Sequence, residues 1–332
     1  MKVTFFVKIK DRKALDIVEF YKQDILLLEK LGCEVVIATK YKEIDWSSNL
    51  IFIWWWTYAW LPVIISKILR KRTVITGTFN FKAPDSPVDF FRRPFWQRIL
   101  IKFAIKNADT NILVSKNELK QIKEEWKLKN LEYSPHVIDT DVYSPAINNI
   151  AKSEYLFSMI WTGRLNLVRK CLPELIKAIK IIKNDNPTIK LLIGGRRGDG
   201  FEYAQAMITD AGLENNITML GEISVEEKIS RLQQCKIYVQ PSRFEGFGVA
   251  IAEAMACGAA VVSSNAGEVP NVLGDAGIII DGYAPEKIAI AVNKLMLDDV
   301  FRKRLQEKAT IRVKENFAFK VRENDFRKIL FK

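Results

Sequence analysis

The chain is poor in histidine and has no paired cysteines. Its 332 residues include one histidine, His136, and four cysteines that stand apart, without a Cys-x-x-Cys pair. This spacing argues against a disulfide framework and against a structural zinc site. No other group of side chains has metal-ligand spacing, so we expect no bound metal and a reducing compartment.

Long apolar segments are missing as well. The longest stretch, LIFIWWWTYAWLPVII at 50–65, contains Pro62 and is shorter than the roughly 20 residues that cross a bilayer. The first residues, MKVTFFVKIKDRK, have an apolar run too short for the core of a secretory signal. Together these features predict a cytoplasmic protein.

Charge of both signs is present but unevenly distributed, and the net charge is +12. Segment 66–106 has ten basic residues against two acidic ones, a balance of +8, whereas 201–300 has six basic and fourteen acidic residues. A basic surface attracts anionic lipid, nucleic acid or phosphorylated small molecules, and charge alone does not choose among them.

The order of apolar runs predicts the fold class. Short runs rich in β-branched and aromatic residues alternate with stretches of helical period, the latter at 14–31, 58–71 and 95–106 in the first half. The alternation restarts at 155–163 and continues to 276–281. Runs without polar alternation indicate strands buried on both faces, hence parallel sheets. We predict an α/β protein of two Rossmann-like, doubly wound domains that face each other across a ligand-binding cleft.

One stretch, RFEGFGVAIAEAMACG at 243–258, combines two acids with glycines. A strand ends before it, so Glu245 is expected in a turn and Glu253 within the following helix. The glycines let a ligand approach the backbone, and the N–H groups that open the helix attract anions. Eight helical residues rise about 12 Å, comparable to the span from ribose to sugar in a nucleotide sugar. The spacing alone is equally consistent with an alternative in which neither acid binds a ligand. In that case Glu245 interacts electrostatically with the start of the helix and Glu253 is a solvated helix residue.

This stretch resembles the retaining GT-B glycosyltransferases of family 4, as do WTGRLNLVRKCLPELIKAI, LGEISVEEKISRLQQCKIYVQPS and SPHVIDTDVYSP. The resemblance implies a metal-independent hexosyltransferase that uses a nucleotide sugar as substrate and needs no cofactor. It implies that Glu245 contacts the hydroxyls of the donor sugar and Glu253 the ribose. The phosphates or sugar would lie on the backbone of Gly246, Phe247, Gly248 and Val249.

A basic pair completes the donor site that the resemblance implies. Arg164 and Lys170, in GRLNLVRK after Gly163, match the family's cations on the diphosphate. The departing nucleoside diphosphate gains negative charge, which fixed cations in a dry cleft stabilise. We therefore assign the catalytic roles to Glu245, Arg164 and Lys170.

The chain also departs from its relatives. Many of them place a histidine beside the donor sugar, and here TGTFNF puts Asn80 at that position. Asn80 is expected either to contact a donor-sugar or acceptor hydroxyl or to close a turn. The only histidine, His136, lies in the predicted linker 132–154, so a histidine general base is not expected.

Segment 132–154 has two Ser-Pro steps and little apolar periodicity, which predicts a connection between domains with a boundary near residue 148. An acceptor-binding domain is expected at 1–148 and a nucleotide-sugar-binding domain at 149–316, and the resemblance implies that 317–332 packs back on the first. Trp54, Trp55 and Trp56 fit either sugar stacking or a core.

The acceptor side offers fewer signals. Segment 90–106 combines aromatic residues with basic ones, and such a helix either lies on an anionic membrane surface or packs inward. We expect a glycan or lipid-linked acceptor of cell-envelope polysaccharide or glycolipid synthesis, peripheral membrane contact and no nucleic acid. The alternatives are a sugar-nucleotide epimerase of the same fold, a basic nucleic-acid-binding protein and a non-catalytic scaffold.

Overall fold

The computed structural model describes residues 1–83, 86, 88–146 and 152–331, which form two compact units. The first unit consists of Met1–Val137 together with Phe319–Lys332, and the second of Ile138–Ala318. The boundary expected near residue 148 lies outside the described residues. The domain limits 1–148, 149–316 and 317–332 therefore stay predictions.

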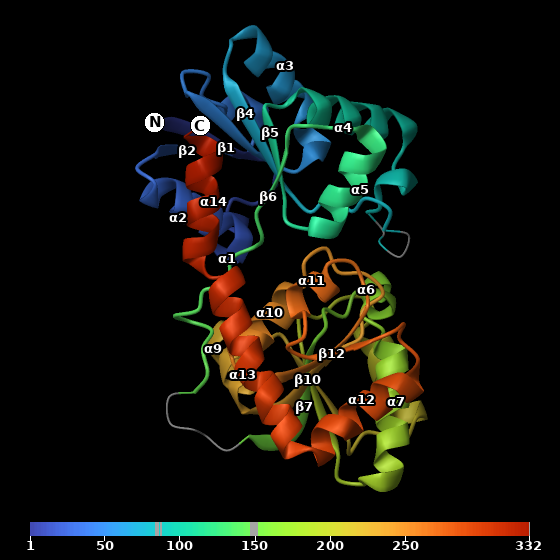
Figure 1. Ribbon diagram of the computed structural model, residues 1–332. Coiled ribbons are helices and arrows are strands. Elements are labelled where there is room, and N and C mark those ends of the chain that lie inside the picture. The colour runs from blue at the N-terminus through green and yellow to red at the C-terminus, as the bar shows by residue number, and fades with distance from the viewer. Residues whose placement is uncertain (84–85, 87, 147–151, 332) are drawn as a thin grey trace. The chain divides into compact units, whose positions relative to one another are not determined.

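The first unit is built on a six-stranded parallel sheet with strand order β2-β1-β3-β4-β5-β6 (Figure 1). Its strands are β1 (Lys2–Val7), β2 (Glu34–Ala38), β3 (Leu50–Trp54), β4 (Arg72–Gly77), β5 (Thr110–Leu113) and β6 (Leu131–Tyr133). β3 is buried along its whole length, as expected for a strand of a parallel sheet covered on both faces.

Helices connect these strands. They are α1 (Ala14–Ile17), α2 (Glu19–Lys30), α3 (Trp60–Ile68), α4 (Phe95–Asn107), α5 (Lys116–Trp126) and α14 (Phe319–Leu330), with 3₁₀ turns η1 (Tyr41–Glu43), η2 (Trp56–Tyr58) and η3 (Phe90–Arg92). The single helix predicted at 14–31 is wrong. Val18 has extended backbone angles and packs against the core, which separates α1 from α2.

The helix α14, red in Figure 1, belongs to the first unit although it follows the second in sequence. Its Arg322 donates to both carboxylate oxygens of Asp24 on α2, at 2.8 and 3.0 Å. Arg322 also donates to the carbonyls of Ser134 and Pro135, each at 2.8 Å. These bonds satisfy a fully buried guanidinium and hold α14 on α2.

The second unit has its own six-stranded parallel sheet, with strand order β12-β11-β10-β7-β8-β9. The strands are β7 (Ser153–Met159), β8 (Lys190–Gly194), β9 (Ile217–Gly221), β10 (Cys235–Gln240), β11 (Ala260–Ser264) and β12 (Ile278–Ile280). The helices are α6 (Arg164–Arg169), α7 (Leu172–Asp185), α8 (Phe201–Asp210), α9 (Val225–Gln234), α10 (Val249–Ala256), α11 (Val269–Leu273), α12 (Pro285–Leu297) and α13 (Asp299–Asn316).

The two sheets confirm the predicted fold class of paired Rossmann-like domains. In each sheet the strand order reverses at one place, between β1 and β3 in the first and between β7 and β10 in the second. At such a switch point the loops leave in opposite directions and open a crevice at the carboxyl ends of the strands. None of the helices in the described ranges has the length and apolar character that are needed to span a bilayer.

Candidate functional site

Most of the residues singled out in the second half of the sequence gather at the switch point of the second sheet. Gly163 and Arg164 follow β7, and Glu245 follows β10, its neighbour in the sheet. Lys170 comes at the end of α6, the short helix that begins at Arg164. Chain folding thus brings Lys170 and Glu245, 75 residues apart in sequence, into direct contact.

Glu245 is almost completely enclosed by hydrogen-bond donors. Its Oε1 accepts from Lys170 Nζ at 2.5 Å, from Ser242 Oγ at 2.6 Å and from Gln240 Nε2 at 2.9 Å. Gln240 is itself oriented by the hydroxyl of Tyr238, which donates to its Oε1. A carboxylate with this many donors is held in one rotamer, so its second oxygen has a defined direction.

That second oxygen, Oε2, lies 3.5 Å from Nη1 of Arg169. Burial alone would raise the pKa of Glu245, but Lys170 and Arg169 outweigh it and lower the pKa below its ordinary value of 4.5. Burial lowers the pKa of Lys170 although Glu245 opposes this. Glu245 is therefore a fixed negative charge at neutral pH.

Lys170 keeps unused donors. Within the part of the chain that the structure describes, its ammonium makes one hydrogen bond, to Glu245, out of the three that an ammonium can donate. The side chain is only 10% exposed. A buried lysine with free N–H groups favours binding of an anion that supplies oxygen atoms.

The second acid of the motif, Glu253, lies inside α10 and is buried. Its Oε1 accepts from Lys228 Nζ on α9 at 2.8 Å. Lys228 also lies 4.9 Å from the ring centroid of Tyr143. Glu253 is therefore a buried carboxylate of α10 whose position is fixed by its ion pair with Lys228. The alternative prediction, that Glu253 is a solvated helix residue, is wrong.

The turn that opens α10 requires glycine. Gly248 precedes the helix with φ of 97°, a backbone conformation that side chains disfavour. Phe247 is buried and packs edge-on against Phe317, with ring centroids 5.4 Å apart. Gly246 and Val249 flank these two residues, and the N–H groups that begin the helix have no acceptor within it. This turn offers backbone donors next to Glu245.

A neighbouring glycine sets the position of Glu245 itself. Gly267 has φ of 55°, and a Cβ there would lie 2.0 Å from the carbonyl oxygen of Glu245. The next residue, Glu268, donates its N–H to the same oxygen at 3.0 Å. Any side chain at position 267 would push the Glu245 backbone away from Lys170.

Arg164 stands apart from this cluster. Its backbone N–H donates to Asp199 Oδ1 at 2.9 Å and its Nε to the carbonyl of Asp199 at 3.4 Å, with the side chain exposed. Asn80 lies in the first unit, with φ of 59°, and its carbonyl accepts from the N–H of Phe90. This left-handed turn accounts for asparagine at position 80. A sugar contact by Asn80 stays a prediction.

Two site residues were missed from the sequence. Arg169 bridges α6 to the motif, since it donates to the carbonyl of Phe244 at 3.0 Å and approaches Glu245. Lys228 pairs with Glu253. Arg169 adjoins Lys170, and a second cation next to a predicted one is a signal that could have found it. No sequence signal separates Lys228 from the other charged residues of its helix.

The arrangement consists of two buried carboxylates, the three cations paired with them and backbone donors, at the carboxyl edge of a doubly wound sheet. Solved structures with the same fold are glycosyltransferases of the GT-B class. The chain matches sucrose-phosphate synthase from Thermosynechococcus elongatus with a TM-score of 0.82 and 16% identity, covering 99% of this chain and 98% of that one. It matches the Anabaena protein HepE, solved with UDP, with a TM-score of 0.81 and 18% identity over 99% of both chains.

The chain belongs to the family described as Glycosyl transferases group 1, whose profile matches residues 145–312. It is 29% identical over 184 residues to a D-inositol 3-phosphate glycosyltransferase of Paenarthrobacter aurescens, covering 52% of this chain and 44% of that protein. It is 28% identical over 211 residues to a poly(glycerol-phosphate) alpha-glucosyltransferase of Bacillus subtilis, covering 61% of this chain and 30% of that protein. The chain thus spans about half or less of these relatives. The resemblance to family 4 is confirmed.

Proposed function

We propose that the protein transfers a hexose from a nucleoside-diphosphate sugar to a glycan or lipid-linked acceptor, with retention of configuration at the anomeric carbon. The observation that carries this proposal is the Lys170–Glu245 contact beside the opening of α10, with Glu253 held inside the same helix. No other cluster of the described residues combines a buried acid, a buried cation and free backbone donors at a switch point. HepE was solved with UDP, so we expect a UDP-sugar as donor.

Each residue has a role set by its charge. Glu245 accepts hydrogen bonds from donor-sugar hydroxyls and Glu253 from ribose hydroxyls. Lys170 stabilises the charge that grows on the diphosphate as the anomeric bond breaks, and Arg164 joins it when its exposed side chain turns toward the phosphates. Donor binding replaces part of the contact between Lys170 and Glu245, because the diphosphate and the sugar each supply a new partner.

The acceptor proton needs no histidine. The acceptor hydroxyl attacks the anomeric carbon on the face from which the diphosphate leaves, and the departing phosphate oxygen takes its proton. This balances the reaction, since one glycosidic bond breaks, one forms and one proton moves to the leaving group. Gly163 and the backbone from Gly246 to Val249 hold the donor in the orientation that this geometry requires.

The first unit has an exposed apolar surface, rich in aromatic residues, that supports a contact with membranes. Around η3 and the start of α4 lie side chains 43 to 70% exposed, namely Val88, Phe91, Phe95, Trp96 and Ile99. Exposed Arg92 and Lys102 flank them. Phe103 instead packs on the core. We include in the proposal that this surface lies on anionic lipid, to which basic and aromatic residues together bind.

Binding to vesicles tests the membrane contact. The wild-type chain should sediment with vesicles that contain phosphatidylglycerol and not with pure phosphatidylcholine. Replacing Phe95 and Trp96 together by serine should reduce the bound fraction several-fold. Replacing exposed Ile290 by serine is the control. Equal sedimentation of all three proteins with both vesicles would contradict the contact.

A thermal-shift screen against UDP-, GDP- and ADP-sugars tests the donor. A ligand that binds only the folded state raises the melting temperature, by an amount that grows with its concentration over Kd. Release of free nucleoside diphosphate in the presence of acceptor extracts separates a transferase from a scaffold. An epimerase would instead isomerise the sugar nucleotide, and a nucleic-acid-binding protein would bind oligonucleotides in a strongly salt-dependent manner. Isomerisation of the sugar nucleotide, or salt-dependent binding of oligonucleotides, without transfer of the sugar would contradict the proposal.

A further inference from the structure

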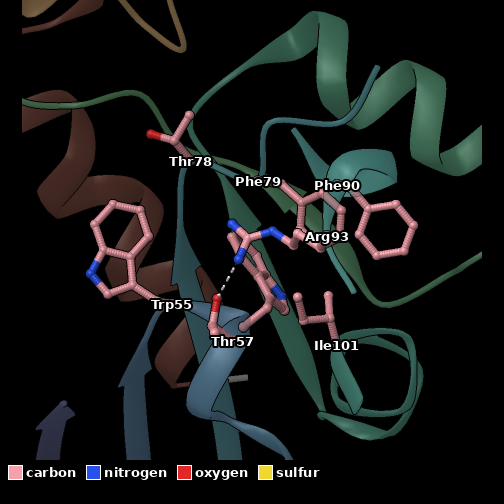
Figure 2. Close-up of a pocket in the computed structure, with 8 residues that line it drawn as sticks. Trp55, Thr57, Thr78, Phe79, Phe90, Arg93 and Ile101 are labelled. Atoms are coloured by element: carbon pink, nitrogen blue, oxygen red, sulfur yellow. Dashed lines mark hydrogen bonds between the residues drawn. The ribbon is translucent and has the colours of Figure 1, made fainter. Parts of the chain in front are cut away.

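A half-buried arginine lies in a small pocket at the carboxyl edge of the first sheet. The pocket is formed by the residues that follow β3 and β4, next to the switch point between β1 and β3. Figure 2 shows Arg93 extending its guanidinium toward Thr57, between Trp55 on one side and Phe79, Phe90 and Ile101 on the other. The switch point of a doubly wound sheet is where a ligand is expected. None of the residues that line the pocket is among those assigned to the donor site of the second unit.

Among the described residues, the hydrogen-bond partners of the Arg93 guanidinium are neutral. Its Nη1 donates to Thr57 Oγ1 at 3.2 Å and to Gln97 Oε1 at 3.5 Å. No carboxylate of the described residues lies within ion-pair distance of it. The charge of Asp89 acts on Arg93, but the oxygens of Asp89 already accept backbone N–H groups of Ala83, Phe91 and Arg92. An arginine with unused donors in a partly dry pocket is suited to a carboxylate or a phosphate.

The size of the cavity limits the ligand. Its volume is about 20 Å³, and one water molecule needs roughly 10–15 Å³ measured in this way. The space therefore takes one or two oxygen atoms and not a sugar ring. A terminal phosphate or carboxylate fits, with its remaining atoms outside. Thr57 and Thr78 line the same space, and the hydroxyl of Thr57, which Arg93 contacts, adds a donor.

The walls of the pocket are fixed before any ligand arrives. Trp55 has φ of 76°, which is strained for a bulky residue. Its indole Nε1 donates to the hydroxyl of Tyr21 at 2.6 Å, and its ring leaves no room for a Cβ at Gly77. On the other side, Glu118 accepts the N–H groups of Phe79 and Phe81 at 3.2 and 3.1 Å. Strained backbone held by its surroundings is typical of binding sites.

A second cation lies at the same edge. Lys8 follows β1, and its ammonium is 4.8 Å from the ring centroid of Tyr58. Tyr58 belongs to the same turn, η2, as Thr57. The first unit therefore presents two positive charges near the β1/β3 switch point, and both favour an anion.

We propose that this pocket binds the anionic group, a phosphate or a carboxylate, of the acceptor through Arg93, Thr57 and Thr78. The assignment of that group to the acceptor rests on the proposed function, whereas the anion site itself does not. The anion belongs either to a free acceptor or to the headgroup of a lipid-linked one.

Titration with glycerol 1-phosphate tests the site, with glycerol as the uncharged control and saturating UDP to occupy the donor site. Quenching of tryptophan fluorescence reports binding, because Trp55 and Trp56 line the pocket. Arg93→Gln should raise the Kd for glycerol 1-phosphate at least about tenfold. The control, Lys22→Gln, removes an exposed cation on α2, outside the pocket and outside the proposed membrane surface, and should change the Kd less than about twofold. Arg93→Lys should give an intermediate Kd, and an unchanged circular dichroism spectrum excludes misfolding of each variant.

Vesicles of phosphatidylglycerol identify the source of the anion. If free glycerol 1-phosphate binds in an Arg93-dependent manner, the site takes a free anion. If only the vesicles bind in that manner, relative to Lys22→Gln, the site takes a lipid headgroup. If Arg93→Gln and Lys22→Gln behave alike in both measurements, the inference is overturned. Failure of UDP-sugars to bind the wild-type chain, with Arg93-dependent anion binding intact, would overturn the proposed function alone.

Discussion

Among the described residues, each unit has one ion pair in which both side chains are at most 10% exposed, and the two pairs differ in how fully their hydrogen-bond donors are used. Arg322 and Asp24 in the first unit have side chains 2% exposed, and the guanidinium also bonds two backbone carbonyls. Lys170 and Glu245 in the second unit lie at an edge where ligands bind, and Lys170 keeps unused donors. A fully satisfied pair holds a structure together, whereas a partly satisfied pair can exchange partners with a ligand.

The hydrophobic cores of the two units also differ, in the types of residue that form them. The core cluster described for the second unit consists of Leu, Ile, Val and Ala, while the two core clusters of the first include Trp54, Trp56 and many phenylalanines. Seven of the eight tryptophans belong to the first unit, and only Trp161 belongs to the second. Tryptophan fluorescence therefore reports on the first unit and nucleotide binding on the second, so the two ion pairs can be broken and observed separately.

The largest effect is expected from Glu245→Gln. The substitution keeps the size but removes the charge that orients the donor sugar and balances Lys170. We expect kcat/KM for sugar transfer to fall about 10²- to 10³-fold, in line with the loss of one stabilising group at a transition state. The Kd for UDP should stay within about twofold, measured by calorimetry. Glu154→Gln is the control, because Glu154 also pairs with a lysine but is 71% exposed. Equal activity of the two variants would remove Glu245 from the site.

Breaking the pair of the first unit should act on stability instead. Asp24→Asn leaves Arg322 buried without a carboxylate, which costs about 3–5 kcal/mol. Urea unfolding followed by tryptophan fluorescence measures the loss, and UDP affinity should not change. Glu29→Gln, an exposed substitution on the same helix, should cost less than about 0.5 kcal/mol. A loss of UDP affinity in Asp24→Asn would show that the two units are coupled.

Protonation of His136 should make the stability of the first unit depend on pH. Burial, and then the charge of Arg322, lower the pKa of His136 to about 3, from 6.5 in the unfolded chain. Between these values the unfolded state binds the proton, so stability falls as the pH falls, by about 1.4 kcal/mol per unit.

Replacing the histidine removes this dependence. From pH 6.5 to 4.5 the wild type should lose about 2.3 kcal/mol more than His136→Asn, in urea unfolding followed by tryptophan fluorescence. Parallel pH profiles would mean that His136 takes up its proton in the folded state.

The smallest effect is expected from Glu253→Ala, and it sharpens the assignment within the second unit. Loss of the ribose contact should raise the Kd for UDP about tenfold. UDP without the 2′ and 3′ hydroxyls should bind the wild type and the variant alike, because the contact is then absent from both. A tenfold difference that persists with this analogue would place Glu253 away from the ribose.

Much of the fold follows from residue order. Buried runs such as Leu50–Trp54 predicted parallel strands, and the restart at 155–163 predicted the second sheet. Local departures from this pattern could not be predicted from the sequence. Val18 continues the helical period of its neighbours but takes extended angles, because it packs on the core. The reversal of strand order in each sheet depends on contacts between distant segments, which residue order alone does not determine.

The site was predictable where chemistry and motif coincide. Glu245 and Lys170 were identified from their setting, and the structure brings them into contact. Arg169 and Lys228 were missed because their importance comes only from what they face in the folded chain. Trp55 shows the same limit, since three adjacent tryptophans fit a core or a ligand surface. Trp54 packs in the core, whereas Trp55 and Trp56 line the pocket, and the backbone of Trp55 turns at the end of β3.

The attachment of α14 to α2 has a consequence for how the chain is made. Asp24 leaves the ribosome 298 residues before its partner Arg322. At 5–20 residues per second this interval is about 15 to 60 s. Throughout it the first unit lacks its last helix, while nearly all of the second unit is synthesised and free to fold. The first unit therefore depends for its completion on α14, which is synthesised after the whole of the second unit.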